Sequence, residues 1–339
     1  MTLRLRFALL AAILAASMLG AGGYVWNVRR EQARTLASAT AAPTRTDLAG
    51  IRAEPHVVFR STALGEGYGK VAVVPLSAPS GARAYTPVSC ERVYATAGDA
   101  ICLYANRGLV TTYKAELLDG SWQATRDLPL TGLPSRTRLS RDGSLVATTT
   151  FIAGDSYTNP GEFSTRTVVT RTDGKVIGDI EKFTLTVDGK VITAADKNMW
   201  GVTFAGDDEF YATAASGGKT WLVRGSLAKR TVTALHEDVE CPSLSPDGTR
   251  IAFKKHGDLP NGKWRLSVYD LRTGTVTELA ETRSVDDQAE WLDDDTVLYG
   301  LARVSGTGAA TSDVWRVPAD GTGTPQVLIP DAWSPAVVR

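Results

Sequence analysis

The side chains that most often carry out chemistry are few in this chain and widely spaced. Three histidines, His56, His236 and His256, lie far apart, so a histidine-rich metal centre is not expected. The three cysteines match no zinc-binding pattern and are too few to form a disulfide scaffold. No G-x-S-x-G motif marks the nucleophile of a hydrolase. We therefore predict no catalytic residue, no metal and no cofactor, and we expect the protein not to be an enzyme.

Two acidic clusters, Asp286-Asp287 and Asp293-Asp294-Asp295, are the best candidates for attracting a cation. Calcium takes about six or more oxygen ligands arranged around one point. Two or three neighbours along the chain do not supply such a set, so we interpret both clusters as solvated turns.

Cys90 and Cys102 lie on consecutive predicted strands of one hairpin. With a turn at residues 97–99, Cys102 is about three residues out of register with Cys90. Three strand residues span about 10 Å, whereas the Cα atoms of a bridged pair lie within about 7 Å. We therefore favour two small buried residues over a disulfide. Export from the cytoplasm would permit oxidation, and the disulfide remains the alternative.

The overall composition is that of a globular protein with balanced charge. Hydrophobic residues make up 43% of the 339 residues and charged residues 22%, which is ordinary for a protein with a core. Lysine plus arginine equals aspartate plus glutamate, at 37 each. Since no basic excess is present, we expect no nucleic-acid partner.

From residue 55 onward the chain repeats one unit of four short strands. The clearest copy is CPSLSPDGTRIAFKK (241–255) followed by WRLSVYDLRTGTVTELAE (264–281), where apolar and polar residues alternate and glycine marks the turns. The second strand of each unit begins in turn at Val57, Ile101, Val146, Tyr211, Ile251 and Leu298. Those starts are 44, 45, 65, 40 and 47 residues apart. A period of about 40–45 residues is typical of the blades of a β-propeller.

The two ends of this repeat complement each other. The first strand of each unit is predicted to end on an apolar residue, namely Tyr94, Leu139, Phe204, Leu244, Trp291 and Trp333. The unit that begins at His56 lacks a first strand, whereas the last residues, AWSPAVVR, form one with nothing after it. We expect Trp333–Val338 to pair with His56–Phe59, because closing the ring removes exposed sheet edges. The predicted fold class is an all-β, six-bladed β-propeller over residues 55–339. A seventh blade is the alternative, and only the 65-residue interval has room for one.

A hydrophobic segment precedes the repeats. Residues 7–28 contain no charged side chain, and about 20 apolar residues suffice to cross a bilayer as a helix. A cleaved signal peptide is the alternative, but the small-residue cleavage pattern is poorly matched. We predict a membrane anchor over residues 1–30, with one transmembrane helix at about 7–28, and a linker over 31–54. We expect a single-pass membrane protein with an extracytoplasmic propeller, although arginines flank both ends of the segment.

The clearest repeat resembles that of a known family. Its run Ser245-Pro-Asp-Gly-Thr-Arg-Ile-Ala-Phe and the later Val268-Tyr-Asp-Leu-Arg-Thr-Gly are similar to the TolB-type propeller repeat, a relative of the WD repeat. The resemblance covers about residues 55–339. It implies a six-bladed ring and protein binding at one face of the central channel. TolB itself works outside the cytoplasmic membrane. The separate N-terminal α/β domain of TolB has no counterpart here, which argues against a Tol-type translocation role.

The first strands of a propeller line its channel, so polar residues just ahead of their apolar ends are the candidate binding residues. These are Arg136, Arg138, Glu240, Asp287, Glu290 and Asp331. Their mixed charges suit a polar ligand or a peptide, and they equally suit ion pairs between blades. The segment FIAGDSYTNPGEFST (151–165), with aromatic residues among polar ones, is a candidate contact loop.

We therefore expect a membrane-tethered binding or scaffold protein whose partner is a protein or peptide of the cell envelope. One alternative is an envelope enzyme of the glycan hydrolase or lactonase type with a polar site in the channel. Another is a purely structural part of an envelope complex.

Overall fold

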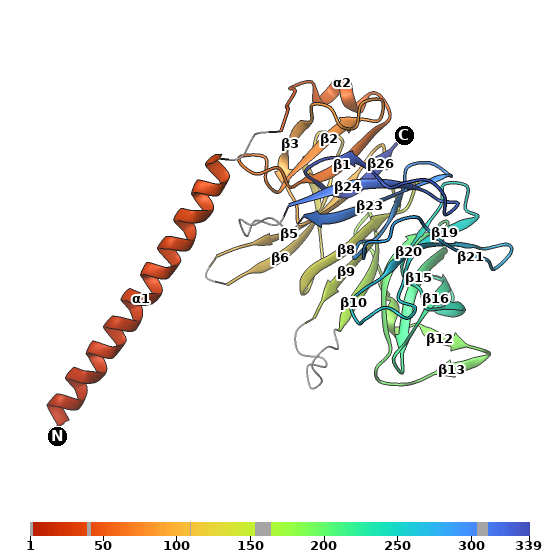
Figure 1. The fold of residues 1–339 in the computed structure, drawn as a ribbon. Coiled ribbons are helices and arrows are strands. Elements are labelled where there is room, and N and C mark those ends of the chain that lie inside the picture. The colour runs from red at the N-terminus through yellow and green to blue at the C-terminus, as the bar shows by residue number, and fades with distance from the viewer. Residues whose placement is uncertain (1–2, 39–41, 109, 153–163, 304–310) are drawn as a thin grey trace.

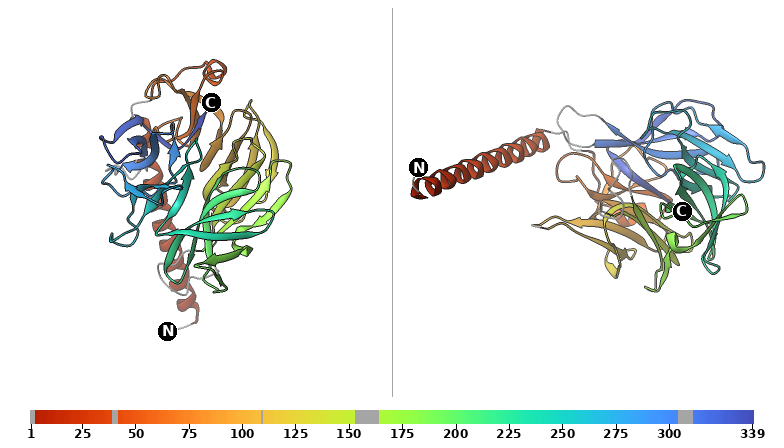
Figure 2. Two further views of the ribbon diagram at one scale, coloured as in Figure 1. Left: turned by 90° about the vertical axis from the view of Figure 1, so that its right-hand side faces the viewer. Right: turned by 90° about the horizontal axis from the view of Figure 1, so that it is seen from below.

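Each repeating unit folds as a small antiparallel sheet. Its strands lie side by side, each one farther from a common axis than the one before. The computed structural model describes residues 3–38, 42–108, 110–152, 164–303 and 311–339. Within these ranges six sheets stand around one centre (Figures 1 and 2). The innermost strand of each sheet contacts those of its two neighbours. The predicted all-β, six-bladed β-propeller is confirmed.

The strands of each blade follow in order from the channel outward. Blade one contains β26 (Ala332–Val338), β1 (His56–Ser61), β2 (Lys70–Pro75) and β3 (Ala84–Ser89), and blade two contains β4 (Arg92–Ala95), β5 (Ala100–Asn106), β6 (Thr112–Leu118) and β7 (Ala124–Leu128). Blade three contains β8 (Leu133–Leu139), β9 (Leu145–Phe151), β10 (Thr165–Arg171) and β11 (Val176–Asp179), and blade four contains β14 (Asn198–Phe204), β15 (Glu209–Ser216), β16 (Lys219–Ser226) and β17 (Thr231–Glu237). Blade five contains β18 (Glu240–Leu244), β19 (Arg250–Lys255), β20 (Arg265–Asp270) and β21 (Val276–Glu278), and blade six contains β22 (Glu290–Trp291), β23 (Thr296–Arg303), β24 (Thr311–Pro318) and β25 (Gln326–Ile329).

The hydrophobic core lies between the blades, because both faces of each blade are covered by its neighbours. Between blades one and two, for example, Val58 and Val73 pack in one cluster with Val93. Gly300 of β23 permits a close approach: a Cβ atom there would lie 2.5 Å from the ring of Trp333 and 2.9 Å from the carboxylate of Asp287. A side chain at residue 300 would therefore displace groups at the channel.

The ring closes between the first and last strands of the propeller. β26 pairs antiparallel with β1, with His56 opposite Val338 and Val58 opposite Ala336, as predicted. Closure gives β1 a partner on both sides and makes β26 the innermost strand of blade one, as β4 is in blade two.

The apolar end of β26 was predicted at the wrong residue. Val337 pairs with Val57, as Tyr94 pairs with Ile101 in blade two, so Val337 and not Trp333 occupies the equivalent position. A register shift in the β1–β26 pairing lies between the pair that contains Val337 and the pair that contains Trp333. Trp333 consequently lies at the opposite end of its strand.

The long interval between the third and fourth repeats contains an added hairpin and no seventh blade. A turn of 3₁₀ helix, η1 (Ile180–Lys182), leads into β12 (Thr184–Val187) and β13 (Lys190–Ile192). β12 pairs in parallel with β17, so the hairpin extends the sheet of blade four. The predicted contact loop falls largely on residues 153–163, which lie outside the described residues.

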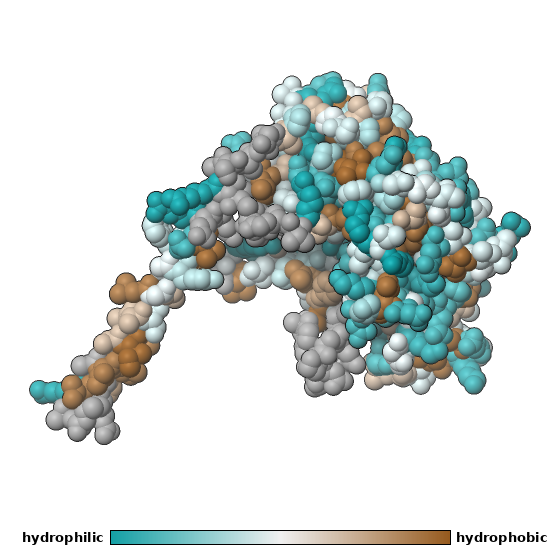
Figure 3. All heavy atoms as spheres, in the orientation of Figure 1, coloured by the Kyte–Doolittle hydropathy of each residue, from teal (hydrophilic) through white to brown (hydrophobic). Residues whose placement is uncertain are grey.

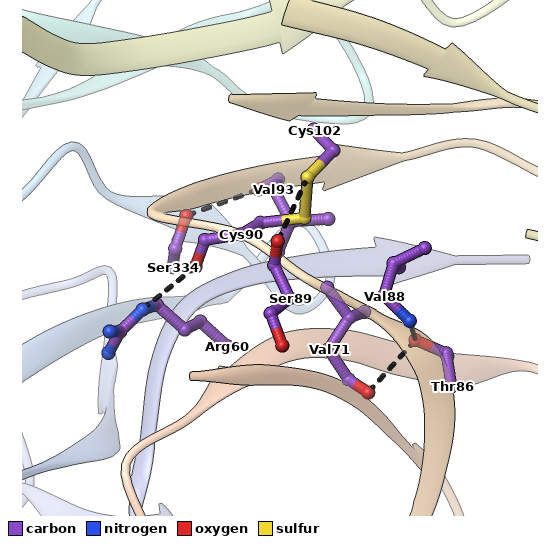
Figure 4. The surroundings of a disulfide bond; sticks show 9 residues. All are labelled: Arg60, Val71, Thr86, Val88, Ser89, Cys90, Val93, Cys102 and Ser334. Atoms are coloured by element: carbon purple, nitrogen blue, oxygen red, sulfur yellow. Dashed lines mark hydrogen bonds between the residues drawn. A yellow bond between two sulfur atoms is a disulfide. The ribbon is translucent and has the colours of Figure 1, made fainter. Parts of the chain in front are cut away.

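Cys90 and Cys102 form a disulfide, so the prediction of two unbridged cysteines was wrong. β4 begins only at Arg92, and Val93 is the residue that pairs with Cys102. Cys90 therefore belongs to the connection from β3, where the chain turns back and brings the Cα atoms within 5.5 Å. The sequence analysis had placed Cys90 within a straight first strand, whereas β4 begins two residues after it. Figure 4 shows that Nε of Arg60, on β1, donates to the Cys90 carbonyl.

The N-terminal segment forms one long helix, α1 (Leu3–Ser38), which runs past the predicted anchor into the predicted linker. It projects away from the propeller (Figure 1), and many of its coloured residues are hydrophobic (Figure 3). Among the described residues, no helix meets the length and hydrophobicity needed to cross a membrane, so the predicted transmembrane helix is not confirmed. The linker also contains the short helix α2 (Leu48–Arg52), and Thr44 bridges to Arg83 beside β3.

Deleting residues 332–339 should destabilise the propeller far more than the loss of a chain end normally does. The deletion leaves β1 as an edge strand and uncovers the innermost strands of two neighbouring blades. We expect no cooperative melting transition by circular dichroism. Deleting Arg339 alone, or replacing the exposed Val327 by Thr, should change the melting temperature little. A truncated protein that melts like the intact chain would contradict the closure.

Removing the disulfide should lower stability by about 3 kcal/mol, the entropy cost expected for a loop of this size. The two cysteines are 12 residues apart. We expect the double variant Cys90→Ala/Cys102→Ala to melt at a lower temperature than the intact protein in differential scanning calorimetry. Dithiothreitol should lower the melting temperature of the intact protein and leave that of the variant unchanged. Three reactive thiols in the denatured, unreduced protein would show that the bridge is absent.

Candidate functional site

The innermost strands of all six blades line one cavity in the channel. Its volume is about 290 Å³, and we name it the channel cavity. Its apolar wall consists of one residue from each blade, namely Val337, Tyr94, Leu139, Phe204, Leu244 and Trp291. Five of these six were predicted from the sequence as the ends of first strands. The cavity opens beside the turns between first and second strands, since Thr96 and Pro246 also line it.

Two arginines at the rim of this cavity were not predicted as site residues. The side chain of Arg141 donates from Nη2 to the Ser245 carbonyl at 2.8 Å, and Arg339 contacts the Leu292 carbonyl in the same way. Both residues are exposed and both line the cavity. The sequence search considered only residues ahead of the apolar ends, whereas these two follow them. For Arg141, the turn sequence Ser140-Arg-Asp-Gly could have indicated a side chain at the mouth of the channel.

A buried ion pair crosses the channel at the inner end of the cavity. Nη1 of Arg138 lies 2.8 Å from Oε2 of Glu290, and their side chains are only 8% and 9% exposed. Arg138 comes from blade three and Glu290 from blade six, which stand opposite each other in a ring of six. Tyr94 of blade two completes the group: its hydroxyl donates to Oε1 of Glu290 at 3.3 Å, and the Arg138 guanidinium lies 4.8 Å from its ring centre. Burial raises the pKa of Glu290, which Arg138 opposes.

A second set of charges lies beyond this pair. Arg92, Arg136 and Asp287 line a small cavity of about 20 Å³ on the far side of Arg138. Oδ1 of Asp287 is 3.8 Å from the Arg92 guanidinium, and its Oδ2 accepts from the Gly300 amide at 3.1 Å. Burial, and then the charge of Arg136, lower the pKa of Arg92 to about 10. The channel is thus filled by side chains between its two ends.

Glu240 lies at this same end of the channel, on β18. Its Oε1 accepts from the indole nitrogen of Trp264 at 2.8 Å, and its Oε2 lies 3.9 Å from Nζ of Lys254. Asp331 lies apart from the channel residues. It pairs with Arg303 and donates its amide to Asp313. The structure therefore brings together five of the six predicted residues and leaves Asp331 outside, since the strand had been placed out of register.

The acidic clusters act within turns and ion pairs. Oδ1 of Asp293 accepts from the Asp295 amide, and Oδ1 of Asp294 accepts from the Asp247 amide of the neighbouring blade. Among the residues that the structure describes, no three His, Cys, Asp or Glu side chains are grouped so as to hold a metal ion.

Breaking the ion pair that crosses the channel should destabilise the fold. Arg138→Met leaves Glu290 buried without its partner, which costs about 3–5 kcal/mol in such sites. We expect a lower free energy of unfolding for Arg138→Met, measured by urea unfolding followed by tryptophan fluorescence. The double variant Arg138→Met/Glu290→Leu should regain most of that free energy. The exposed Arg141→Met is the matched control and should unfold like the intact chain. If Arg138→Met also unfolds like the intact chain, the pair does not support the channel.

No protein-family model matches this chain, and no curated protein matches it. Among solved structures, TolB from Acinetobacter baumannii is similar over 84% of this chain and 67% of its own, with 16% identity and a TM-score of 0.53. A TolB from Agrobacterium tumefaciens is similar over 83% and 90%, with 13% identity and a TM-score of 0.48. A puromycin-hydrolyzing peptidase from Mycobacterium tuberculosis is similar over 81% and 43%, with 15% identity and a TM-score of 0.49.

The expectation that the protein is not an enzyme is contradicted by this comparison. The similar structures include enzymes, namely the peptidase above and an oligogalacturonate lyase, at 15% and 10% identity. A fold does not fix a function, so the propeller architecture leaves catalysis open. At this level of identity the likeness concerns architecture alone, and the chain has the TolB-like six-bladed β-propeller fold.

Proposed function

We propose that this protein binds a protein or peptide of the cell envelope at the channel cavity. The observation that carries the proposal is the convergence of all six innermost strands on one cavity with an apolar wall and a cationic rim. Ligand sites are concave and mostly apolar, with a few polar groups that fix orientation. A cavity of about 290 Å³ is at the small end of that range, so it would hold a few side chains of a polypeptide and not a domain.

A second hollow extends this surface across the same face. Its volume is about 310 Å³, and it shares Arg141, Phe204 and Leu244 with the channel cavity. Asp142 and Asp247, from the turns of blades three and five, line its other side. A groove that runs from the channel to the rim suits an extended chain, and charges of both signs would set its orientation.

The location outside the cytoplasm and the membrane tether are part of the same proposal. The Cys90–Cys102 bridge supports this location, because disulfides persist mainly in oxidising compartments. The tether is supported by the charge-free run at residues 7–28, which lies within α1. The thiol count described above also tests the location: if Cys90 and Cys102 react, beside the free Cys241, in protein denatured without reduction directly from cells, the result would argue against it.

Site-directed photo-crosslinking tests the binding surface. A photoreactive residue at Ala97, which lines the channel cavity, should give one discrete crosslinked product in cell envelopes. Arg141→Glu should reduce that product severalfold while the melting temperature of the purified protein stays unchanged, because the side chain is exposed. A photoreactive residue at Lys229, on an exposed turn that does not line the cavity, is the control. The same products from both positions, or a product insensitive to Arg141→Glu, would refute binding at this cavity.

A further inference from the structure

The end of the channel away from the channel cavity holds a buried lysine beside an arginine. The side chain of Lys254, on β19, is only 4% exposed, and its Nζ lies 3.9 Å from the ring centre of Trp264. Arg136, on β8, has a side chain that is 12% exposed. Burying two cations is costly unless anions compensate them. Their anionic partners therefore indicate what this place can bind.

The three carboxylates at this end are held in different ways. Glu240 also accepts a hydrogen bond from the indole of Trp264, and Asp287 accepts one from the Gly300 amide. Asp286 differs from both. Its Oδ1 lies 2.8 Å from Nζ of Lys254 and 3.6 Å from the Arg136 guanidinium. Among the described residues, we find only these two cations within bonding distance of its carboxylate.

Asp286 is also the exposed member of the group. Its side chain is 64% exposed, whereas those of Glu240 and Asp287 are 12% and 3% exposed. The backbone on either side is fixed, because Val285 and Asp287 are buried and the Val285 amide donates to the Trp264 carbonyl. The Asp286 carboxylate can thus leave the cations by side-chain rotation alone, with no movement of the chain.

The charges match the replacement of one carboxylate by another. Without Asp286, the anions Glu240 and Asp287 face the cations Arg92, Arg136 and Lys254, which leaves one positive charge uncompensated. Arginine and lysine side by side bind carboxylate oxygens through charge-assisted hydrogen bonds. The place that Asp286 vacates would be open to solvent on one side and lined by these cations on the other.

We propose that Arg136 and Lys254 form a carboxylate-binding site at this end of the channel, which the side chain of Asp286 fills when no ligand is bound. The ligand is a free carboxylic acid or an acidic side chain of a polypeptide, and it replaces the Asp286 carboxylate on the same two cations. This site is separate from the channel cavity, and it does not depend on the function proposed there.

A purely structural ion pair would give a different arrangement. A carboxylate that only neutralises Lys254 is best placed when it is buried with it, as Glu290 is with Arg138. Glu240 already provides a mostly buried partner at 3.9 Å. The exposed position of Asp286, with no neutral donor holding it, favours an occupant that can be exchanged.

Rescue of Asp286→Ala by formate tests the site. Formate presents the same carboxylate without a side chain, so it should bind where Asp286 was. At about ten times its dissociation constant it should raise the melting temperature of the variant by roughly 3 °C relative to chloride at equal ionic strength. The intact protein and Asp286→Glu should need a much higher formate concentration for the same rise, because formate must first displace their own carboxylate. Asp286→Ala/Lys254→Met should lose the response.

The salt bridge between Lys255 and Glu278 provides a matched control. Its N–O distance is 2.9 Å, but Glu278 is exposed, Lys255 is only partly buried, and no arginine assists. Glu278→Ala should therefore show no difference between formate and chloride. Equal responses of Asp286→Ala and Glu278→Ala would overturn the proposal. If Asp286→Ala does not fold, Asp286→Ser takes its place, with the same expected result and the same contradicting one.

A second arm separates the two sources of the carboxylate. The blocked peptide acetyl-Ala-Asp-Ala-amide is compared with acetyl-Ala-Asn-Ala-amide on Asp286→Ala. Stabilisation by the acidic peptide and not by the neutral one supports a polypeptide ligand, and stabilisation by formate alone supports a small acid. No stabilisation by formate or by the acidic peptide excludes the site.

Discussion

The hydrogen bonds between β26 and β1 are the constraint on which the rest of the ring depends. Each blade covers its apolar faces with its two neighbours, so a ring with one gap would leave two faces and two strand edges uncovered. β26 fills this gap with the last residues of the chain, which complete the sheet that begins at His56. The channel exists only because the sheet of blade one is whole: Val337 of β26 supplies one of the six residues of the apolar wall, and Arg339 supplies part of the rim.

Charges buried along the axis are the second constraint. Six inner strands converge there, and their polar side chains have lost contact with water, so they are paired or hydrogen-bonded. Arg138 with Glu290, and Arg92 with Asp287, satisfy this requirement by joining different blades. These contacts fill the middle of the channel and leave two separate ends. One end is the channel cavity with its apolar wall. At the other end, Arg136 and Lys254 lie beneath the exposed carboxylate of Asp286.

The repeat predicted most of the fold, because the same four-strand pattern recurs and its two ends fit each other. The sequence also placed Arg136, Arg138, Glu240, Asp287 and Glu290 near one another, since residues ahead of the apolar ends of first strands share one level in a propeller. It failed where the strands depart from regularity. A shift in the β1–β26 register moved Trp333 and Asp331 away from the position assumed for them.

Three other features were missed, each for its own physical reason. The late start of β4 brought Cys90 over Cys102, which a regular strand would have kept apart. Arg141 was missed because its role depends on which face of the ring a turn emerges from, and this is a property of the three-dimensional arrangement. Lys254, on a second strand, approaches the channel through the length of its side chain, which strand position alone does not reveal.

The pairing of the first and last strands also affects how the chain acquires its structure. His56 and Val338 are almost a whole propeller apart in sequence, so their contact is among the most non-local that the chain makes. Loop closure over such a length is slow, and the native core of blade one cannot form until the final residues are available. The bridge between Cys90 and Cys102, by contrast, closes a short loop and can form early. A chain still being synthesised therefore stays open at the seam, and the ring closes only after β26 has emerged.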